Sequence, residues 1–301
     1  MMSPAMAEQL IGRRAAGTLR RRSSSYGVNR RPGWGTYAFL ALVLLISVYP
    51  LYFAILLASS DAATIAQHPI PSLVPDGRLI ENFLRVIGSD IKFWTAVGNS
   101  VIVSVVTAAS VVFFSTLAGY SFAKLRFRGR DGLLVFVIAT MAVPTQLGIV
   151  PLFIVMSNLG WVGKLQAVIV PGMVTAFGVF WMTQYLRDAL PFELIEAARV
   201  DGASMIRTFW SVAMPAARPA AAMLALFTFV GSWTNFFWPF IILGSANPTL
   251  PVALQLLQAS YFKDYSLIMT GVVLATLPLI LVFVVAGRQL VAGIMQGAVK
   301  G

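Results

Sequence analysis

Long apolar runs without a charged residue dominate the pattern of the chain. The runs that lack Asp, Glu, Lys and Arg are 32–60, 93–123, 133–163, 165–186, 219–262 and 265–287. A helix needs about 20 such residues to cross a bilayer, so 219–262 is too long for one span. Its turn-forming stretch Gly244–Pro251 divides it. The pattern predicts six transmembrane helices, near 34–58, 95–119, 133–156, 168–187, 219–243 and 266–287. Barrel strands of about 10 alternating residues would not give such continuous runs.

The composition agrees with a membrane protein. Hydrophobic residues make up 58% of the chain and charged residues only 11%, whereas soluble domains carry about 25% charged residues. The net charge of +11 is unevenly placed: with six spans, 17 of the 22 Lys and Arg residues fall on the side that holds both termini. The positive-inside rule then puts both termini in the cytoplasm. The basic charge therefore orients the chain, and no nucleic acid is expected as a partner.

The same pattern predicts the organisation of the chain. Residues 1–33 form an Arg-rich cytoplasmic tail, which we expect to be disordered, to orient the protein and to be able to touch anionic lipid headgroups. The membrane domain covers 34–288 and includes a cytoplasmic loop at 188–218, and 289–301 form a cytoplasmic C-terminal tail. The apolar run after the Arg-rich tail is long enough to span, so a cleavable signal is not expected.

Several kinds of chemistry are missing from the sequence. There is no G-x-x-x-x-G-K-[ST] phosphate loop, no Cys, and a single histidine, His68, in a Pro-rich loop. We therefore expect this chain to bind no cofactor and no metal, and a membrane-embedded enzyme would lack its acid, base or metal. The span interiors also lack ionisable residues, which ion- and proton-coupled transporters usually place at depth. An uncharged path suits an uncharged polar solute, with energy supplied from outside the membrane.

One polar loop interrupts this apolar chain. Pro191 suits the first turn of a short helix over 192–201, and Gly202 suits a left-handed stop after it. Ser204 can cap a second helix over 205–212. The loop is thus predicted to be a helix-turn-helix at the cytoplasmic surface. The small pair Ala197 and Ala198 would let a partner surface approach closely, and the alternative is an amphipathic hairpin that only lies on the membrane.

This loop resembles the EAA loop of inner-membrane permeases from binding-protein-dependent ABC importers. The spacing is Glu-Ala-Ala, three residues, Gly, nine residues and a short apolar stretch that ends in Pro. Val212 and Met214 stand where that family has Ile and Leu. The matching residues that the resemblance assigns to coupling with an ATPase are Glu196, Ala197, Ala198, Asp201, Gly202 and Pro215.

Other stretches resemble the carbohydrate branch of that family, of the maltose-permease second-subunit type. They are 118–127, 143–146 with 151–153, and the terminal Gly297, Ala298, Val299, Lys300 and Gly301. The resemblance implies a sugar importer of the inner membrane, a second and usually different permease, an ATPase dimer that holds ATP and Mg, and an extracytoplasmic solute-binding protein. It also implies that the terminal residues contact the ATPase pair; the sequence alone allows a frayed tail there.

The sequence offers candidates for the solute path where polar or aromatic residues lie near helix breakers at mid-membrane depth. Sugars bind apolar ring faces beside hydrogen-bonding groups. On this basis Gln146, Phe177, Phe180 and Asn235 are predicted to line the path, with the alternative that the aromatics face lipid.

Three other classes of function stay open at this point: import of another uncharged polar solute, secondary transport, and export, although exporters commonly carry their ATPase on the same chain.

Overall fold

The structure is a computed structural model that describes residues 33–68, 70, 72–258 and 263–298, of which 288–298 are described as backbone only. The regular structure of these residues is helical, which confirms the all-α prediction. The elements are α2 (Trp34–Ser59), α3 (Ala62–Gln67), α4 (Leu79–Ile87), α5 (Phe93–Lys124), α6 (Arg130–Thr140), η1 (Thr145–Gly148), α7 (Ile149–Asn158), α8 (Gln166–Gly172), α9 (Ala176–Ala189), α10 (Phe192–Val200), α11 (Met205–Thr208), η2 (Phe209–Ala213), α12 (Met214–Trp233), α13 (Phe237–Leu243), α14 (Leu250–Gln258) and α15 (Tyr265–Ala298).

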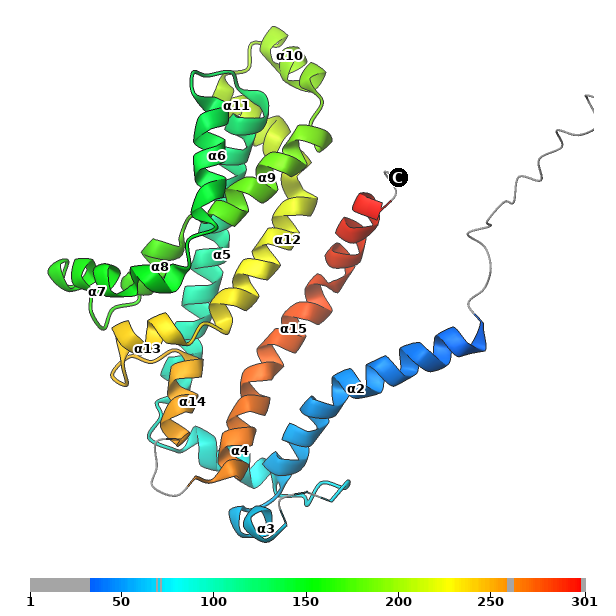
Figure 1. Cartoon of the computed structure of the whole chain (residues 1–301), viewed down its shortest axis with the longest axis vertical. Helices are drawn as coiled ribbons and strands as arrows, with labels where there is room; N and C mark the ends of the chain where they lie inside the picture. The colour runs from blue at the N-terminus through cyan, green and yellow to red at the C-terminus, as the bar shows by residue number, and fades with distance from the viewer. Residues whose placement is uncertain (1–32, 69, 71, 259–262, 299–301) are drawn as a thin grey trace, which may run out of the picture. The chain divides into compact units, whose positions relative to one another are not determined.

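The chain divides inside α2 into two compact units, residues 1–49 and 50–301. In the described part of the first unit, every residue of the segment 33–49 is exposed. The second unit contains every other element (Figure 1). In it, α10 and α11 lie at one end of the long helices, and α3 and α4 lie at the other.

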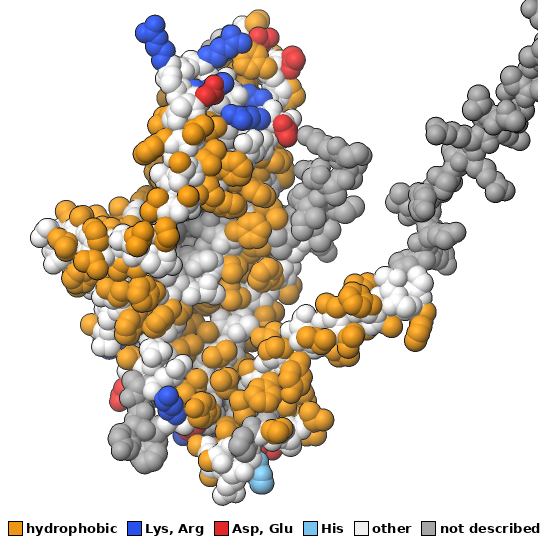
Figure 2. Space-filling model, in the orientation of Figure 1, with side chains coloured by type: hydrophobic (Ala, Val, Ile, Leu, Met, Phe, Trp, Pro, Cys, Tyr) orange, Lys and Arg blue, Asp and Glu red, His pale blue; other side chains and the backbone are white. Residues whose placement is uncertain are grey.

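Among the described residues, five helical segments are long and apolar enough to span a membrane, and a sixth candidate is a bent pair of helices. Within the second unit, charged side chains gather at the two ends, and apolar side chains cover the band between them (Figure 2). This is the surface expected of a protein whose middle faces lipid. The five segments are Trp34–Ser59, Phe93–Lys124, Gln166–Ala189, Met205–Trp233 and Tyr265–Gly287.

Three of the predicted spans differ from the observed helices. The span expected at 168–187 is divided into α8 and α9, with Pro171 near the end of α8. The single span expected at 133–156 is instead α6 followed by η1 and α7, with a bend of 89°. Pro144 lies in this bend, and it has no N–H to continue the helix ladder. The span expected at 219–243 is also displaced: α12 begins at Met214, encloses Pro219 and ends at Trp233 before the short α13.

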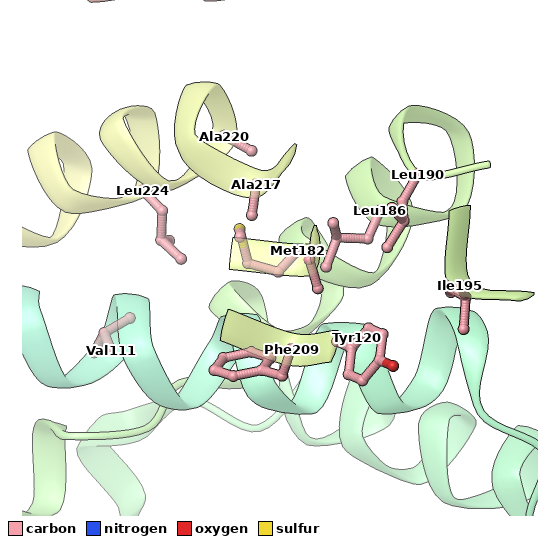
Figure 3. Packing of buried hydrophobic residues seen from close by; sticks show 11 residues of the cluster. Val111, Tyr120, Met182, Leu186, Leu190, Ile195, Phe209, Ala217, Ala220 and Leu224 are labelled. Carbon is pink, nitrogen blue, oxygen red and sulfur yellow. The ribbon is translucent and has the colours of Figure 1, made fainter. Parts of the chain in front are cut away.

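Helices α5, α9 and α12 pack together and carry the main core. Gly119 of α5 allows a close approach, because a Cβ there would lie 2.7 Å from the Cβ of Met182 on α9. Small residues that bring backbones close are the usual means of helix association in lipid. Figure 3 shows this core, whose buried members are Val111, Tyr120, Met182, Leu186, Leu190, Ile195, Phe209, Ala213, Ala217, Ala220 and Leu224.

Hydrogen bonds and an ion pair hold the opposite end together. Asn99 of α5 donates to the Asn247 side chain at 2.7 Å and to the Pro248 carbonyl at 2.8 Å. Arg85 of α4 pairs with Asp264, just before α15, at 3.1 Å. These links join segments far apart in sequence, so the loops at this end are fixed to the long helices.

Candidate functional site

Helix α10 ends in a backbone motif that its sequence dictates. Gly202 follows the helix with φ +76°, a left-handed conformation that glycine adopts freely. Its N–H donates to the Arg199 carbonyl at 3.0 Å, and the N–H of Ala203 donates to the Ala198 carbonyl at 2.9 Å. This pair of bonds is a Schellman motif, which satisfies carbonyls that the helix end leaves free. The turn has the conformation that the sequence predicts at Gly202.

Helix α11 begins at a side-chain cap and continues into the membrane helix. Ser204 Oγ accepts from the N–H of Arg207 at 3.3 Å. The sequence predicts a separate helix over 205–212, but the structure has α11 only to Thr208, then one π-helical turn and α12 without a gap. In that turn the N–H of Met214 donates to the Phe209 carbonyl. Such single turns accommodate an extra residue in a helix, here directly before Pro215, which lacks an N–H.

Buried side chains anchor α10 and the π-helical turn to the transmembrane core. Ile195 is fully buried and belongs to the core of α5, α9 and α12 (Figure 3). Phe209 is 3% exposed and its ring lies 6.0 Å from that of Tyr120. A displacement of α10 would therefore be transmitted to the membrane helices through packed side chains.

The outer face of α10 is open to a partner. Glu196, Ala197, Asp201 and Gly202 are exposed, and Ala198 is half-buried. Val200 is 87% exposed, which is unusual for a large apolar side chain on a helix that is anchored by its other face. The face thus combines small, acidic and apolar groups, as protein-docking helices do.

The remaining coupling candidate is Pro215. It is exposed and lies in the first turn of α12, where a proline's fixed φ suits a helix start. The structure places it after the π-helical turn and thus at the beginning of the membrane helix, separate from the α10 face in sequence.

The four solute-path candidates lie on η1, on α9 and in the break between α12 and α13. Gln146 is exposed in η1, inside the bend between α6 and α7, and Asn235 is exposed in the break between α12 and α13. Phe177 and Phe180 share α9, and Phe180 is half-buried. Both polar candidates thus lie at helix breaks, as expected of groups that line a path.

Sequence reasoning missed the aromatic row that continues from Phe177. The Phe177 ring lies 5.9 Å from the Trp181 ring, which lies 6.4 Å from the ring of Phe227 on α12. Trp181 is fixed because its Nε1 donates to the Ala220 carbonyl at 3.2 Å. Phe177 is 40% exposed and Phe227 50%. Helical spacing of aromatics at 177 and 181 is the only signal in the sequence that points to the row.

The predicted terminal contacts lie at the limit of the structure. Gly297 and Ala298 are described only as the backbone of the last residues of α15, and Val299, Lys300 and Gly301 lie outside the described residues. The Arg-rich segment 1–32 lies outside them as well. Within the described part of the chain, no three His, Asp or Glu side chains form a group that could hold a metal ion.

Comparison with known proteins places the chain in one family. The sequence model of the family described as "binding-protein-dependent transport system inner membrane component" matches residues 112–294. The arabinooligosaccharides transport system permease protein AraQ of Halalkalibacterium halodurans is 32% identical, over 88% of this chain and 94% of that protein. The lactose transport system permease protein LacG of Rhizobium radiobacter is 30% identical, over 90% and 97%.

A solved structure supports the fold. It is a chain of a bacterial ABC transporter involved in the import of the acidic polysaccharide alginate, with a TM-score of 0.72. The match covers 84% of this chain and 94% of that chain at 23% identity. The two chains therefore share the helical fold described above.

Proposed function

Because this chain belongs to the family of binding-protein-dependent transport system inner membrane components, we propose that it is the permease subunit of an ABC importer that carries a sugar or oligosaccharide into the cytoplasm. The five to six apolar helical segments fit a multi-pass protein of the bacterial inner membrane. The names of AraQ and LacG, which specify arabinooligosaccharides and lactose, support a saccharide as solute.

The chain would work as one part of an assembly. Its partners would be a second permease, in a heterodimer, an ATPase dimer that holds ATP and Mg, and an extracytoplasmic binding protein that delivers the solute. This subunit itself would be non-catalytic and would form part of the translocation pathway, with both termini in the cytoplasm. The uneven distribution of Lys and Arg supports that orientation.

The observation that carries the coupling role is the anchored, outward-facing α10. Its exposed residues Glu196, Ala197, Asp201 and Gly202 would dock on the ATPase subunit, with Ala198 allowing close approach and Pro215 stiffening the return to the membrane. Ile195 on the opposite face joins the core of α5, α9 and α12. Movement of the ATPase could thus tilt these helices as a body. The terminal residues 297–301 would add a second contact with the ATPase pair.

The solute would meet this chain at the helix breaks. Asn235 is our leading polar contact, and Gln146, Phe177 and Phe180 would line the same path. The row of Phe177, Trp181 and Phe227 supplies the flat apolar surfaces on which sugar rings stack.

The test of the proposed function begins with purification of the tagged chain from its own membranes. We expect a second permease and an ATPase to co-purify, and we expect the ATPase rate of the complex to rise only when the binding protein and a saccharide are both added. Stimulation by an uncharged solute that is not a sugar would support the importer function but exclude a saccharide as the solute. Isolation of the chain without an ATPase, with no stimulation by any solute, would contradict the proposal.

The orientation has its own test, because the chain has no native cysteine. Val200→Cys would add a single thiol at an 87% exposed position of α10. We expect an impermeant maleimide to label it only from the cytoplasmic side. Labelling only from the outer side would invert the topology and exclude an ATPase contact at α10.

A further inference from the structure

Two adjoining hollows lie where α5 ends beside α10 and α11. The first, an apolar groove with a volume of about 260 Å³, is lined by Phe113, Leu117, Tyr120, Ser121, Leu125, Met205, Ile206, Phe209 and Trp210. The second, a basic hollow of about 400 Å³, is lined by Lys124, Leu125, Arg126, Phe192, Glu196, Arg199 and Met205. Leu125 and Met205 belong to both linings, so the groove and the hollow adjoin each other.

The groove has the length of one membrane leaflet. Its lining along α5 and the residue that follows this helix runs from Phe113 to Leu125, which corresponds to about 18 Å at the helical rise per residue. Half of the hydrocarbon core of a bilayer is about 15 Å. The groove therefore extends from the polar boundary at Lys124 to about mid-membrane, over the distance that a single acyl chain covers.

The apolar side chains that line the groove stay exposed instead of packing together to fill it. Trp210 stacks on Phe113 with ring centroids 5.9 Å apart, yet it stays 54% exposed. Ile206 is 73% exposed and Leu117 40%. The π-helical turn at Phe209–Ala213 buries Phe209 while Trp210 faces outward. A continuous exposed apolar groove of this kind is suited to a lipid or to another helix.

The basic hollow carries positive charge, and an apolar transmembrane helix would offer no negative group to pair with it. Lys124, Arg126 and Arg199 line it against one carboxylate, Glu196, and the carboxylates of Asp188 and Glu193, outside the lining, also act on Lys124. The ammonium of Lys124 also donates to the Arg187 carbonyl at 2.9 Å, which fixes its position at the end of α5. Guanidinium groups bind phosphate oxygens in a fork geometry. Excess positive charge at the polar end of an apolar groove matches an anionic headgroup followed by its hydrocarbon chain.

We propose that this composite site binds one anionic phospholipid of the cytoplasmic leaflet, with its phosphate in the basic hollow and an acyl chain in the groove. The placement in that leaflet rests on the orientation proposed above. Arg199 and Glu196 belong to α10, whereas Lys124 and Arg126 belong to the end of α5 and the loop after it. The bound headgroup would therefore bridge the coupling helix to the membrane domain, and the lipid composition would tune how firmly α10 is held.

The test uses the whole transporter complex in nanodiscs of neutral phosphatidylcholine. Brominated acyl chains quench tryptophan on contact, and the difference between the parent and Trp210→Phe isolates Trp210 from the other six tryptophans. We expect brominated phosphatidylglycerol to half-quench Trp210 at a mole fraction about tenfold lower than brominated phosphatidylcholine, because several basic side chains favour the anionic headgroup.

Matched variants separate this site from general surface charge. Arg126→Gln is expected to lower the lipid preference about fivefold, and Arg126→Lys, which keeps the charge, is expected to restore most of it. Arg128 is exposed and outside both linings, so Arg128→Gln should keep the parental preference. Each variant is first checked for co-purification with its partner subunits.

Three results would overturn the proposal. Equal quenching by the two lipids would show that the headgroup is not recognised, and equal losses in Arg126→Gln and Arg128→Gln would show only surface attraction. If neither lipid quenches Trp210, protein such as the second permease covers the groove. Saccharide-stimulated ATPase activity in the same neutral nanodiscs reports on the importer function separately, so the lipid site can fail while that function stands.

Discussion

Replacement of Gly202 tests how the conformation of the α10 turn contributes to transport. Its φ of +76° is a conformation that L-residues rarely adopt, and nothing lies within 4 Å of an added Cβ. The cost of Gly202→Val is therefore set by the backbone alone, at about 1–2 kcal/mol. Since 1.4 kcal/mol is a factor of ten, the native turn would be about tenfold less favoured against alternatives. Asn tolerates this conformation, so Gly202→Asn should cost less.

The assay for this prediction is ATP-driven uptake in proteoliposomes, with membrane level and subunit stoichiometry measured in parallel. We expect Gly202→Val, alone or with Glu196→Lys, to assemble normally and lose most uptake, and Gly202→Asn to keep most of it. Gly129→Val is the matched control, since Gly129 has φ +79° and equally open space but lies between α5 and α6. Full uptake in the Gly202→Val, Glu196→Lys variant, or equal losses in Gly202→Val and Gly129→Val, would refute the coupling argument.

Three further predictions concern the anchor, the outer end and the solute path. Ile195→Ala should lower the free energy of unfolding by about 2–5 kcal/mol, because Ile195 is fully buried. Thermal unfolding of the detergent-solubilised complex checks this prediction. Leu194→Ala is the control and should be nearly neutral, because Leu194 is 51% exposed. Burial raises the pKa of Asp264. Hydrogen bonds from Ser266 and Leu267 and the Arg85 guanidinium together lower this pKa by more than burial raises it, so it falls below its ordinary value of 3.8. The ionised Asp264 carboxylate therefore stabilises the fold at pH values above 3.8, and this stabilisation is lost as pH falls through the lower, folded-state pKa. Asp264→Asn should flatten the dependence of the unfolding temperature on pH below about 4. An unchanged dependence would contradict this role of Asp264. Asn235→Leu should change the apparent affinity or selectivity for sugar while the ATPase still assembles; parental values for single replacements of Gln146, Phe177, Phe180 and Asn235 would show that the second permease handles the solute.

Hydropathy located the membrane helices but could not give their ends. The runs predicted at 95–119 and 266–287 are the inner parts of α5, Phe93–Lys124, and α15, Tyr265–Ala298. An apolar run reports the length of chain in hydrocarbon, whereas a helix continues into the polar flanks as long as its backbone hydrogen bonds persist.

Prolines explain the larger differences. Pro144 lies in the 89° bend between α6 and α7, while Pro219 lies inside an unbroken α12. Both residues lack an N–H, and whether the helix survives depends on how neighbouring helices and local π or 3-10 turns satisfy the freed carbonyls. That depends on tertiary contacts, which a single sequence does not contain.

The candidate site was predictable where its chemistry is local. The left-handed turn at Gly202 and the cap at Ser204 follow from residue type and spacing. The anchoring of Ile195 depends on contacts with distant helices. The hollow lined by both Arg126 and Arg199 likewise joins segments far apart in the chain, so neither feature has a signature in a local pattern.

The most direct test of the central claim is saccharide uptake by proteoliposomes that contain the purified complex and the binding protein. We expect uptake that requires ATP on the side of the ATPase subunits and continues when an ionophore collapses the proton gradient. Uptake that stops with the proton gradient while ATP is maintained, or that proceeds on the gradient without ATP, would contradict it.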